Sequence, residues 1–265
     1  MLVLGPSRKE PTVSKQPNPT GHPARFSQEV LDLAAELLMA RYPEWLGRPY
    51  VFDPFAGTGE ALARLSATLI AAEPEHIGFQ VTGVEIEPAY IVNAELVKPG
   101  DALDRSCYEQ APTGGLVIFT SPVYPNGMAD HHRPKDTSVR RTYLVSLMAL
   151  TGDAAYEMDE HNMGRYGFRG TRRDGTSKRR AAYWDLAEKA VAVWAGCAQH
   201  VLLNVSDFMH SNGQVEPVVD DWKAVLHKHG FTEQFDHPVA TSRMRMGANH
   251  DQRVANEVIV EARRG

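Results

Sequence analysis

Short apolar segments of strand length alternate with helical segments along most of this chain, and no other feature of the sequence restricts the fold as strongly. Repeated strand-helix-strand units cross over in a right-handed sense and build a mainly parallel sheet with helices on both faces. We therefore predict an α/β fold. Strands are expected at residues 50–53, 79–86, 116–120, 200–208, 233–244 and 256–262, and helices are expected to begin near residues 27, 61, 88, 182 and 217. The helix that Pro88 opens is expected to reach about Val97.

Two segments interrupt this pattern. Residues 1–21 are rich in Pro, Ser, Lys and Thr without periodicity, which predicts a mobile tail ahead of a domain at 22–265. Residues 125–181 form an irregular insert in which, up to Arg180, eleven Lys/Arg stand against seven Asp/Glu, although the whole chain has a net charge of −5. Such a region is either a surface that contacts phosphates or a solvated loop, and charge alone does not choose between them. The basic residues are Arg133, Lys135, Arg140, Arg141, Arg165, Arg169, Arg172, Arg173, Lys178, Arg179 and Arg180.

The remaining composition excludes several classes of protein. No apolar run approaches the roughly 18 residues that span a bilayer, so no membrane partner is expected. The N-terminus lacks the order of regions that marks a secretion signal, which favours a cytoplasmic location. The two cysteines, Cys107 and Cys197, stand apart without a nearby His cluster, so we expect neither a disulfide framework nor a metal site.

A glycine-containing turn follows the first expected strand, with the sequence DPFAGTGE at residues 53–60. Glycine lets the backbone turn tightly and approach a ligand without interference from a Cβ atom. Open parallel sheets bind ligands at this edge. A turn of this kind is weak evidence alone, but the absence of a GxGxxG pattern disfavours a nicotinamide-dependent dehydrogenase.

Two acidic residues, Glu85 and Asp101, stand further along the chain. Glu85 stands at the end of the strand expected at 79–86, where a carboxylate can accept hydrogen bonds from both ribose hydroxyls of a nucleoside. Asp101, between Gly100 and Ala102, can accept a hydrogen bond from an adenine amino group. Taken singly, an acid such as Glu85 is more commonly a solvated strand end, and Asp101 favours a simple turn.

The sequence TSPVYP occupies residues 120–125, directly after the buried strand expected at 116–120. Its prolines hold an extended, rigid backbone and fix the direction of the carbonyl groups. Tyr124 offers a flat face on which an extruded base can stack, a contact worth about 1–3 kcal/mol. By itself, the segment favours a rigid loop that carries a surface tyrosine.

Together, these segments resemble the family of amino-methyltransferases that act on DNA bases, over residues 22–124 and 182–262. DPFAGTGE is similar to the cofactor loop of that family, and TSPVY is similar to its catalytic (Asp/Asn/Ser)-Pro-Pro-(Tyr/Phe) motif. His22-Pro23-Ala24-Arg25-Phe26 is similar to the segment that closes over the methionine end of the cofactor. Val123 replaces the second proline of the motif, whereas the first proline, whose carbonyl the family uses, is kept as Pro122.

The resemblance implies a Rossmann-like methyltransferase fold, with a mostly parallel seven-stranded sheet, helices on both faces and an antiparallel last strand. It also implies S-adenosyl-L-methionine as cofactor, and duplex DNA with a flipped target base as partner. The order of the motifs assigns target recognition to residues 125–181. The implied catalytic residues are Ser121, Pro122 and Tyr124. The implied cofactor-binding residues are Pro23, Ala24, Phe26, Asp53, Phe55, Gly57, Thr58, Gly59, Glu85, Ile86, Asp101, Ala102 and Thr120.

The implied chemistry is methylation of an exocyclic base amine. The lone pair of the amine nitrogen is delocalised into the ring, so we expect Ser121 and the Pro122 carbonyl to accept hydrogen bonds from the amino protons and make the nitrogen a better nucleophile. Catalysis would then come from positioning and oriented dipoles. Methylation of cytosine carbon 5 needs a thiolate, and neither Cys107 nor Cys197 follows a proline. Serine in the first motif position is more often associated with cytosine, which favours cytosine N4 over adenine N6.

Two other functions stay open at this stage. One is an RNA base amino-methyltransferase on the same fold, because the cofactor loop would serve it equally well. The other is a non-catalytic, nucleic-acid-binding relic of the fold, which Val123 favours and the retained Ser121, Pro122 and Tyr124 disfavour. The sequence leaves open the recognition sequence, the oligomeric state and any cognate restriction nuclease.

Overall fold

The computed structural model describes residues 26–41, 49–72, 78–109, 115–123, 151–152, 157–166, 178–209, 214–240 and 256–265. Its α-helices are α1 (Gln28–Arg41), α2 (Glu60–Ala72), α4 (Lys178–Ala195) and α5 (Val218–Lys228). Short 3-10 helices are η2 (Pro88–Tyr90), η3 (Arg105–Tyr108) and η4 (Met163–Tyr166). The strands are β1 (Tyr50–Asp53), β2 (Gln80–Glu85), β3 (Val97–Pro99), β4 (Leu116–Thr120), β5 (His200–Val205), β6 (Phe208–Met209), β7 (Val215–Glu216), β8 (Glu233–Ala240) and β9 (Asn256–Arg263). None of the helices in these ranges has both the length and the apolar character to span a bilayer.

Seven strands form one sheet in the order β3-β2-β1-β4-β5-β9-β8. The pairings from β3 through β5 are all parallel, whereas β9 runs antiparallel to both β5 and β8. Six strands therefore point one way and the last strand of the chain points the other way. The predicted α/β class, the mostly parallel seven-stranded sheet and the antiparallel last strand are confirmed.

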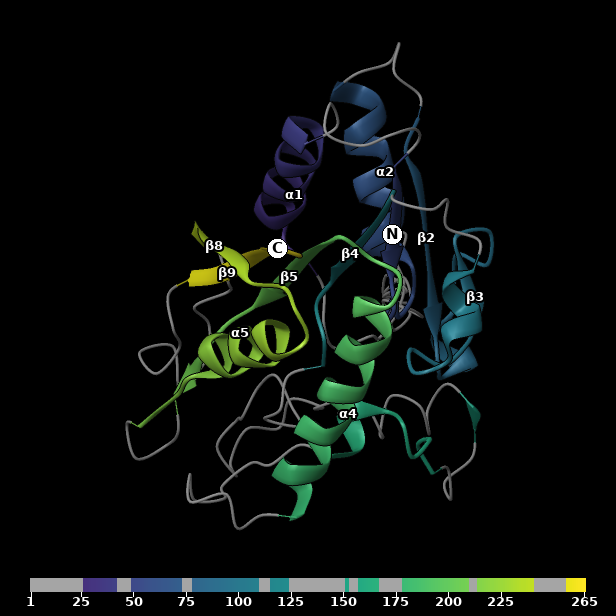
Figure 1. Cartoon of the computed structure of the whole chain (residues 1–265). Coiled ribbons are helices and arrows are strands. Elements are labelled where there is room, and N and C mark those ends of the chain that lie inside the picture. Colours follow the sequence, from purple (N-terminus) through teal and green to yellow (C-terminus); the bar gives the residue numbers. More distant parts are fainter. Residues whose placement is uncertain are drawn as a thin grey trace, which may run out of the picture.

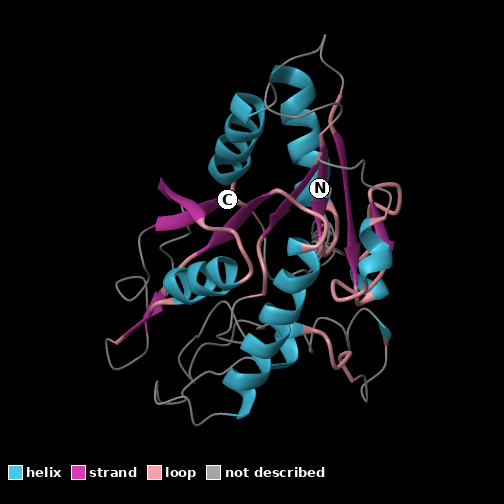
Figure 2. Ribbon diagram, in the orientation of Figure 1, coloured by secondary structure: helices cyan, strands magenta, loops and turns pink. Residues whose placement is uncertain are grey.

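Helices cover both faces of this sheet (Figure 1). On one face, α1 and α2 enclose a core around Val51, Val117 and Phe119. On the other face, α4 and α5 pack with the alternate side chains of the same strands, including Phe52 and Ile118. Figure 2 shows the strands as a twisted layer between the two pairs of helices. This double cover explains why β1 and β4 are buried along their whole length and apolar up to their last residues, Asp53 and Thr120.

The beginning of α1 follows the expectation from sequence. The Val30 amide donates to the Ser27 hydroxyl oxygen at 3.2 Å, which caps the helix, and Glu29 stands in the first turn, where a negative charge is favourable. At the other end of the chain, α5 stops before Gly230, whose φ of 93° is one that a side chain disfavours. The predicted limits of these two helices are therefore confirmed.

The helix expected from Pro88 to Val97 is wrong. Only the 3-10 turn η2 forms there, and β3 begins at Val97. The amides of Val92 and Asn93 both donate to the Thr58 carbonyl, at 3.3 and 3.1 Å, so they are not available for helical hydrogen bonds. Long-range pairing with the glycine turn thus prevails over the local helical pattern.

The strand expected at 200–208 is also divided. It ends at Val205, and Phe208–Met209 forms β6, which pairs with β7 in a separate two-stranded ribbon. The expected strand 233–244 is described only to Ala240, so its last four residues lie outside the described part of the chain.

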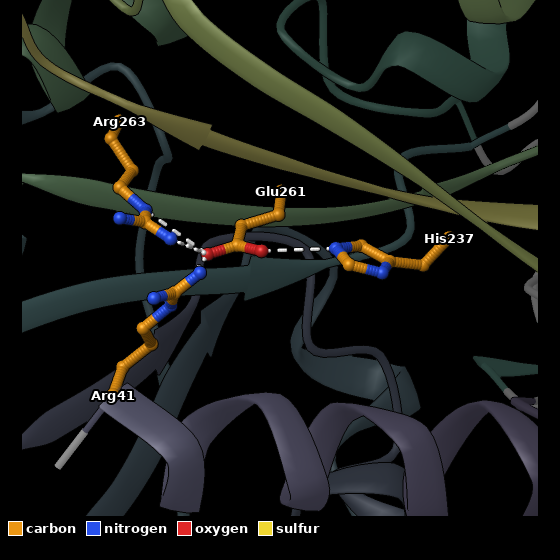
Figure 3. A network of polar contacts seen from close by, with 4 residues as sticks. All are labelled: Arg41, His237, Glu261 and Arg263. Atoms are coloured by element: carbon orange, nitrogen blue, oxygen red, sulfur yellow. Dashed lines mark hydrogen bonds and ion pairs between the residues drawn. The ribbon is translucent and has the colours of Figure 1, made fainter.

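A polar network fastens the end of α1 to the antiparallel side of the sheet. The carboxylate of Glu261, on β9, is 2% exposed and accepts hydrogen bonds from Arg41, Arg263 and His237 at 2.7–3.1 Å (Figure 3). Burial raises the pKa of Glu261, but the hydrogen bonds from Arg263, His237 and Arg41 outweigh this and bring the pKa below its ordinary value. The buried charge is therefore well compensated.

Candidate active site

The carboxyl ends of β1, β2, β3 and β4 meet at one edge of the sheet because these strands are parallel. The chain runs outward from β1 through β2 to β3 and then returns to β4 on the other side of β1. Loops that follow such neighbouring strands diverge and leave a crevice, where ligands of open α/β sheets bind. The turn after Asp53 and the segment after Thr120 therefore flank the same crevice.

A solvent-open pocket lies at this edge, and the space between its walls, open solvent included, is about 520 Å³. Six residues that the sequence predicted as catalytic or cofactor-binding line it: Phe55, Glu85, Ile86, Asp101, Ala102 and Ser121. The rest of its wall comes from Pro54, Tyr90, Val123, His161, Asn162 and Met163. One pocket thus brings together the segments that follow β1, β2, β3 and β4.

Asp53 joins the glycine turn to β4. Its Oδ1 accepts hydrogen bonds from the Phe55 amide at 2.9 Å and from the Thr120 hydroxyl at 2.5 Å. The carboxyl group is 1% exposed, and this burial raises its pKa to about 7, although the two hydrogen bonds act in the opposite direction. Asp53 therefore orients the start of the turn and does not itself line the pocket.

Glu85 occupies the end of β2, as predicted. Its two carboxylate oxygens accept hydrogen bonds from the amides of Gly57 and Glu87, each at 2.9 Å. Burial raises its pKa to about 7, the two amide hydrogen bonds lower it, and the nearby charges of Glu87 and Asp53 raise it. An ionised carboxylate has about four acceptor positions, so Glu85 keeps the capacity to accept from ligand hydroxyl groups.

The glycine turn needs its glycines for conformational and steric reasons. Gly57 and Gly59 have φ values of 56° and 76°, in the left-handed region. A Cβ atom on Gly59 would lie 2.7 Å from Cγ2 of Val97, closer than real Cβ contacts. The amide of Ala56 also donates to the Val84 carbonyl at 3.0 Å, so the turn lies tightly against β2.

Asp101 has two partners in the structure. Its Oδ1 accepts from the Leu103 amide at 2.8 Å, and its Oδ2 lies 2.5 Å from Nδ1 of His161. This hydrogen bond raises the pKa of His161 above its ordinary 6.5, against a smaller opposing effect of burial. A ligand amino group that uses Asp101 as acceptor therefore competes with the His161 imidazole.

Residues 157–166 form a wall of the pocket, although they fall within the insert expected at 125–181. The buried Glu87 carboxylate accepts from the Asp159 amide at 3.0 Å and from the Asn162 side chain at 2.8 Å. Met163 is also buried. Sequence reasoning missed Glu87, His161, Asn162 and Met163 as site residues, and no periodicity or motif in this irregular stretch marks them.

The other residues predicted from the sequence lie behind the pocket lining, in the core, next to Ser121 or outside the described residues. Gly57 donates to Glu85, and Thr120 donates to Asp53, so both support the pocket from behind its lining. Phe26 packs against Phe119 in the core under α1 and α2, with ring centroids 4.9 Å apart, and its carbonyl accepts from Arg64. Pro122 follows Ser121 in the same segment. Pro23, Ala24 and Tyr124 lie outside the described residues.

The basic residues of the insert are only partly described. Arg180, at the start of α4, is 13% exposed and paired with Glu216 and Asp221, so its charge is neutralised within the protein. Arg165 is exposed and donates to the Met158 carbonyl at 2.7 Å, and Lys178 is exposed. The other basic residues between 125 and 177 lie outside the described ranges, and so does the side chain of Arg179.

No protein-family model matches the sequence, and no curated protein matches it either. Solved structures with similar folds include a type IIG restriction endonuclease, BpuSI, at a TM-score of 0.44 and 12% identity over 91% of this chain and 25% of that one. A precorrin-6y C5,15-methyltransferase from Geobacter metallireducens gives a TM-score of 0.43 and 11% identity over 91% of both chains. A TehB-like SAM-dependent methyltransferase from Corynebacterium glutamicum gives 0.40 and 13% over 87% of this chain and 86% of that one.

Structures with so little sequence identity indicate a similar fold and nothing about function. The fold class therefore rests on the strand order of the sheet. The strand order β3-β2-β1-β4-β5-β9-β8, with β9 alone antiparallel, is that of the Rossmann-like methyltransferase fold. The predicted fold class is confirmed.

Proposed function

We propose that this protein transfers a methyl group from S-adenosyl-L-methionine to an exocyclic amino group of a base in DNA, with cytosine N4 preferred. The observation that carries the proposal is the position of Ser121, which follows β4 and lines the same pocket as Phe55, Glu85 and Asp101. A donor and an acceptor of the methyl group must meet in one place, and this pocket joins the two segments that would hold them.

The pocket residues fit the proposed cofactor. Glu85 offers acceptor positions for the ribose hydroxyls, and Asp101 offers one for the adenine amino group. Apolar side chains of Phe55, Ile86 and Tyr90 in the same wall suit the faces of a purine ring. When bound, the cofactor supplies an electrophilic methyl group on a sulfonium sulfur.

Ser121 and Pro122 are the residues proposed to act on the target amine. The Ser121 hydroxyl oxygen and the Pro122 carbonyl oxygen accept hydrogen bonds from the two amino protons. The nitrogen lone pair would then be less delocalised into the base and more available for the methyl carbon. As the nitrogen–carbon bond forms, the carbon–sulfur bond of the cofactor would break, and the methylated amine would release one proton to solvent to become neutral. Neither residue forms a covalent bond, so the rate gain comes from positioning and from oriented dipoles.

The choice of DNA and of cytosine rests on the sequence. Serine in the first position of the motif favours the cytosine amine. The basic residues of the insert, apart from Arg180, which is paired within the protein, are of the type that contacts a polyanionic substrate. A base inside a duplex must be extruded to reach a pocket at a sheet edge, which costs a few kcal/mol. Stacking on Tyr124 would offset part of this cost.

The test is methyl transfer from radiolabelled S-adenosylmethionine to unmodified duplex DNA, followed by hydrolysis to nucleosides and chromatography. We expect N4-methylcytosine as the labelled nucleoside. The Ser121→Ala variant should lose about tenfold or more in kcat, because one acceptor on the amine is lost, while its cofactor affinity stays within about twofold of wild type. Tyr50→Phe, at the opposite end of β1, is the matched control.

Other results would point to the remaining functions. Label in N6-methyladenine alone would move the target to adenine. Preferential transfer to structured RNA in a competition experiment would replace DNA as substrate. Cofactor binding without transfer to either nucleic acid would favour the non-catalytic relic and overturn the proposal.

A further inference from the structure

We propose that Tyr183 is a positioning residue for the catalytic segment, which it holds through the carbonyl of Val123. The Tyr183 hydroxyl donates to this carbonyl oxygen at 2.8 Å. Val123 stands where the resembled motif has its second proline, directly after Ser121-Pro122. The inference rests on the proposed function and adds to it a source of rigidity at the position where Val123 replaces the second proline of the motif.

The surroundings of Tyr183 fix the direction of its hydroxyl group. Its side chain is fully buried in α4, and its ring meets Trp184 and Trp222 edge to face, with centroids 5.0 and 6.4 Å away. Trp222 in turn stacks on Trp194 at 6.3 Å. A ring enclosed in such a cluster cannot rotate away, and a buried phenol needs a hydrogen-bond acceptor. The Val123 carbonyl provides one.

The restrained peptide is the one that links Val123 to Tyr124. A proline at 123 would lock its own φ near about −65°, whereas valine leaves φ free to vary. A hydrogen bond to the Val123 carbonyl restrains the same stretch of chain from its other end. The Val123 side chain also packs between Tyr90 and the cluster under α4. Together, these contacts hold the backbone at Val123, directly after Ser121-Pro122.

The same helix braces the other side of the pocket by a separate route. Trp194 donates from Nε1 to the Tyr108 hydroxyl oxygen at 3.1 Å, and Tyr108 donates to the Ala102 carbonyl at 2.8 Å. Ala102 lies on the side of the pocket that we assign to adenine. The hydroxyl groups of Tyr183 and Tyr108 therefore hold two different walls of the pocket. Removing each hydroxyl should change a different kinetic constant.

The experiment compares Tyr183→Phe with Tyr108→Phe in the full-length protein, each assayed for methyl transfer to DNA. Tyr183→Phe should lower kcat about tenfold, as expected for the loss of one net hydrogen bond, with the KM for the cofactor within about twofold of wild type. Tyr108→Phe should instead raise the cofactor KM. Tyr50→Phe removes a hydroxyl far from the pocket and should change neither constant.

A rescue variant separates positioning from a general role in packing. Adding Val123→Pro to Tyr183→Phe restores the restraint on the chain by a different means, so kcat should recover by at least about threefold. A kcat of Tyr183→Phe equal to wild type, or equal losses in kcat and cofactor affinity, would overturn the proposal. If the double variant does not fold, hydrogen exchange in Tyr183→Phe tests the positioning role instead.

Hydrogen exchange needs no nucleic-acid substrate, so it tests the positioning role of Tyr183 even if the proposed function is wrong. In the presence of S-adenosylhomocysteine, peptides that contain residues 121–124 should exchange at least about threefold faster in Tyr183→Phe than in Tyr50→Phe. Peptides from β4 and from the second half of α4 should keep their protection. Unchanged exchange at 121–124 contradicts the positioning role. Absence of methyl transfer by the wild-type protein contradicts only the proposed function.

Discussion

Replacement of Asp53 by asparagine should stabilise this protein, and more so at alkaline pH. In the structure, Oδ1 of Asp53 accepts both hydrogen bonds, from Phe55 and from Thr120. An asparagine places its carbonyl oxygen in the same position and keeps both. The substitution therefore removes a buried negative charge and leaves the turn geometry intact.

The size of the effect follows from the pKa of Asp53, which burial raises from 3.8 to about 7. A raised carboxyl pKa stabilises the folded state fully only below the unfolded pKa, and this stability is lost as the pH rises through about 7. Each tenfold change in the ionisation equilibrium is worth about 1.4 kcal/mol. The free energy of unfolding of Asp53→Asn should thus exceed that of wild type by about 1–2 kcal/mol at pH 5 and by about 4 kcal/mol at pH 8.

Urea unfolding at pH 5, 6, 7 and 8 measures this difference directly. Thr120→Val is the companion variant, because it removes a hydrogen bond that lowers the pKa of Asp53 and should therefore destabilise the protein more at pH 8 than at pH 5. A difference between Asp53→Asn and wild type that is the same at all four pH values would refute the reasoning. Greater stability of the wild type at pH 8 would refute it as well.

Three further variants test the pocket and the sheet. Gly59→Ala should lower the free energy of unfolding by about 1–3 kcal/mol in urea, because its φ is positive and Val97 occupies the space of its Cβ. Calorimetry should show that the affinity for S-adenosylhomocysteine increases as the pH rises past the His161 pKa, which lies above 6.5, because a neutral His161 releases Asp101. His161→Ala should weaken this dependence and leave the part that comes from ionisation of Glu85, whose pKa is about 7. Glu261→Gln should lower the free energy of unfolding by about 3–5 kcal/mol at pH 7, and by less as the pH falls toward 4, because its lowered pKa stabilises the fold only above the unfolded value.

Much of the fold follows from local sequence signals. The apolar runs at β1 and β4 have no alternation because both of their faces are covered, and Ser27 and Gly230 mark helix ends by their hydrogen bonding and backbone conformation. The helix that we expected between Pro88 and Val97 does not form, for a different reason. There, the Thr58 carbonyl, more than thirty residues earlier in the chain, accepts from Val92 and Asn93, and no local pattern reveals such a contact.

The candidate site likewise contains residues that the sequence predicts and residues that it does not. Glu85 and Ser121 were predictable because the ends of parallel strands converge at one edge, whatever the loops do. His161 and Asn162 were not predictable, since their places depend on single contacts with Asp101 and Glu87 across sixty or more residues of sequence. Tyr183 gave no sign of its contact with Val123, because an aromatic residue on a buried helix face is an ordinary core residue.

The wall formed by residues 157–166 has a consequence for protein engineering. Under the proposed function, a change of sequence preference would be sought by exchanging the whole stretch 125–181 for that of a related protein. Such a chimera would lose the Asn162 contact with Glu87 and the His161 contact with Asp101, and with them part of the lining of the pocket. Under the same proposal, grafts that keep residues 157–166 of the recipient should retain affinity for S-adenosylhomocysteine, whereas exchange of all of 125–181 should lower it.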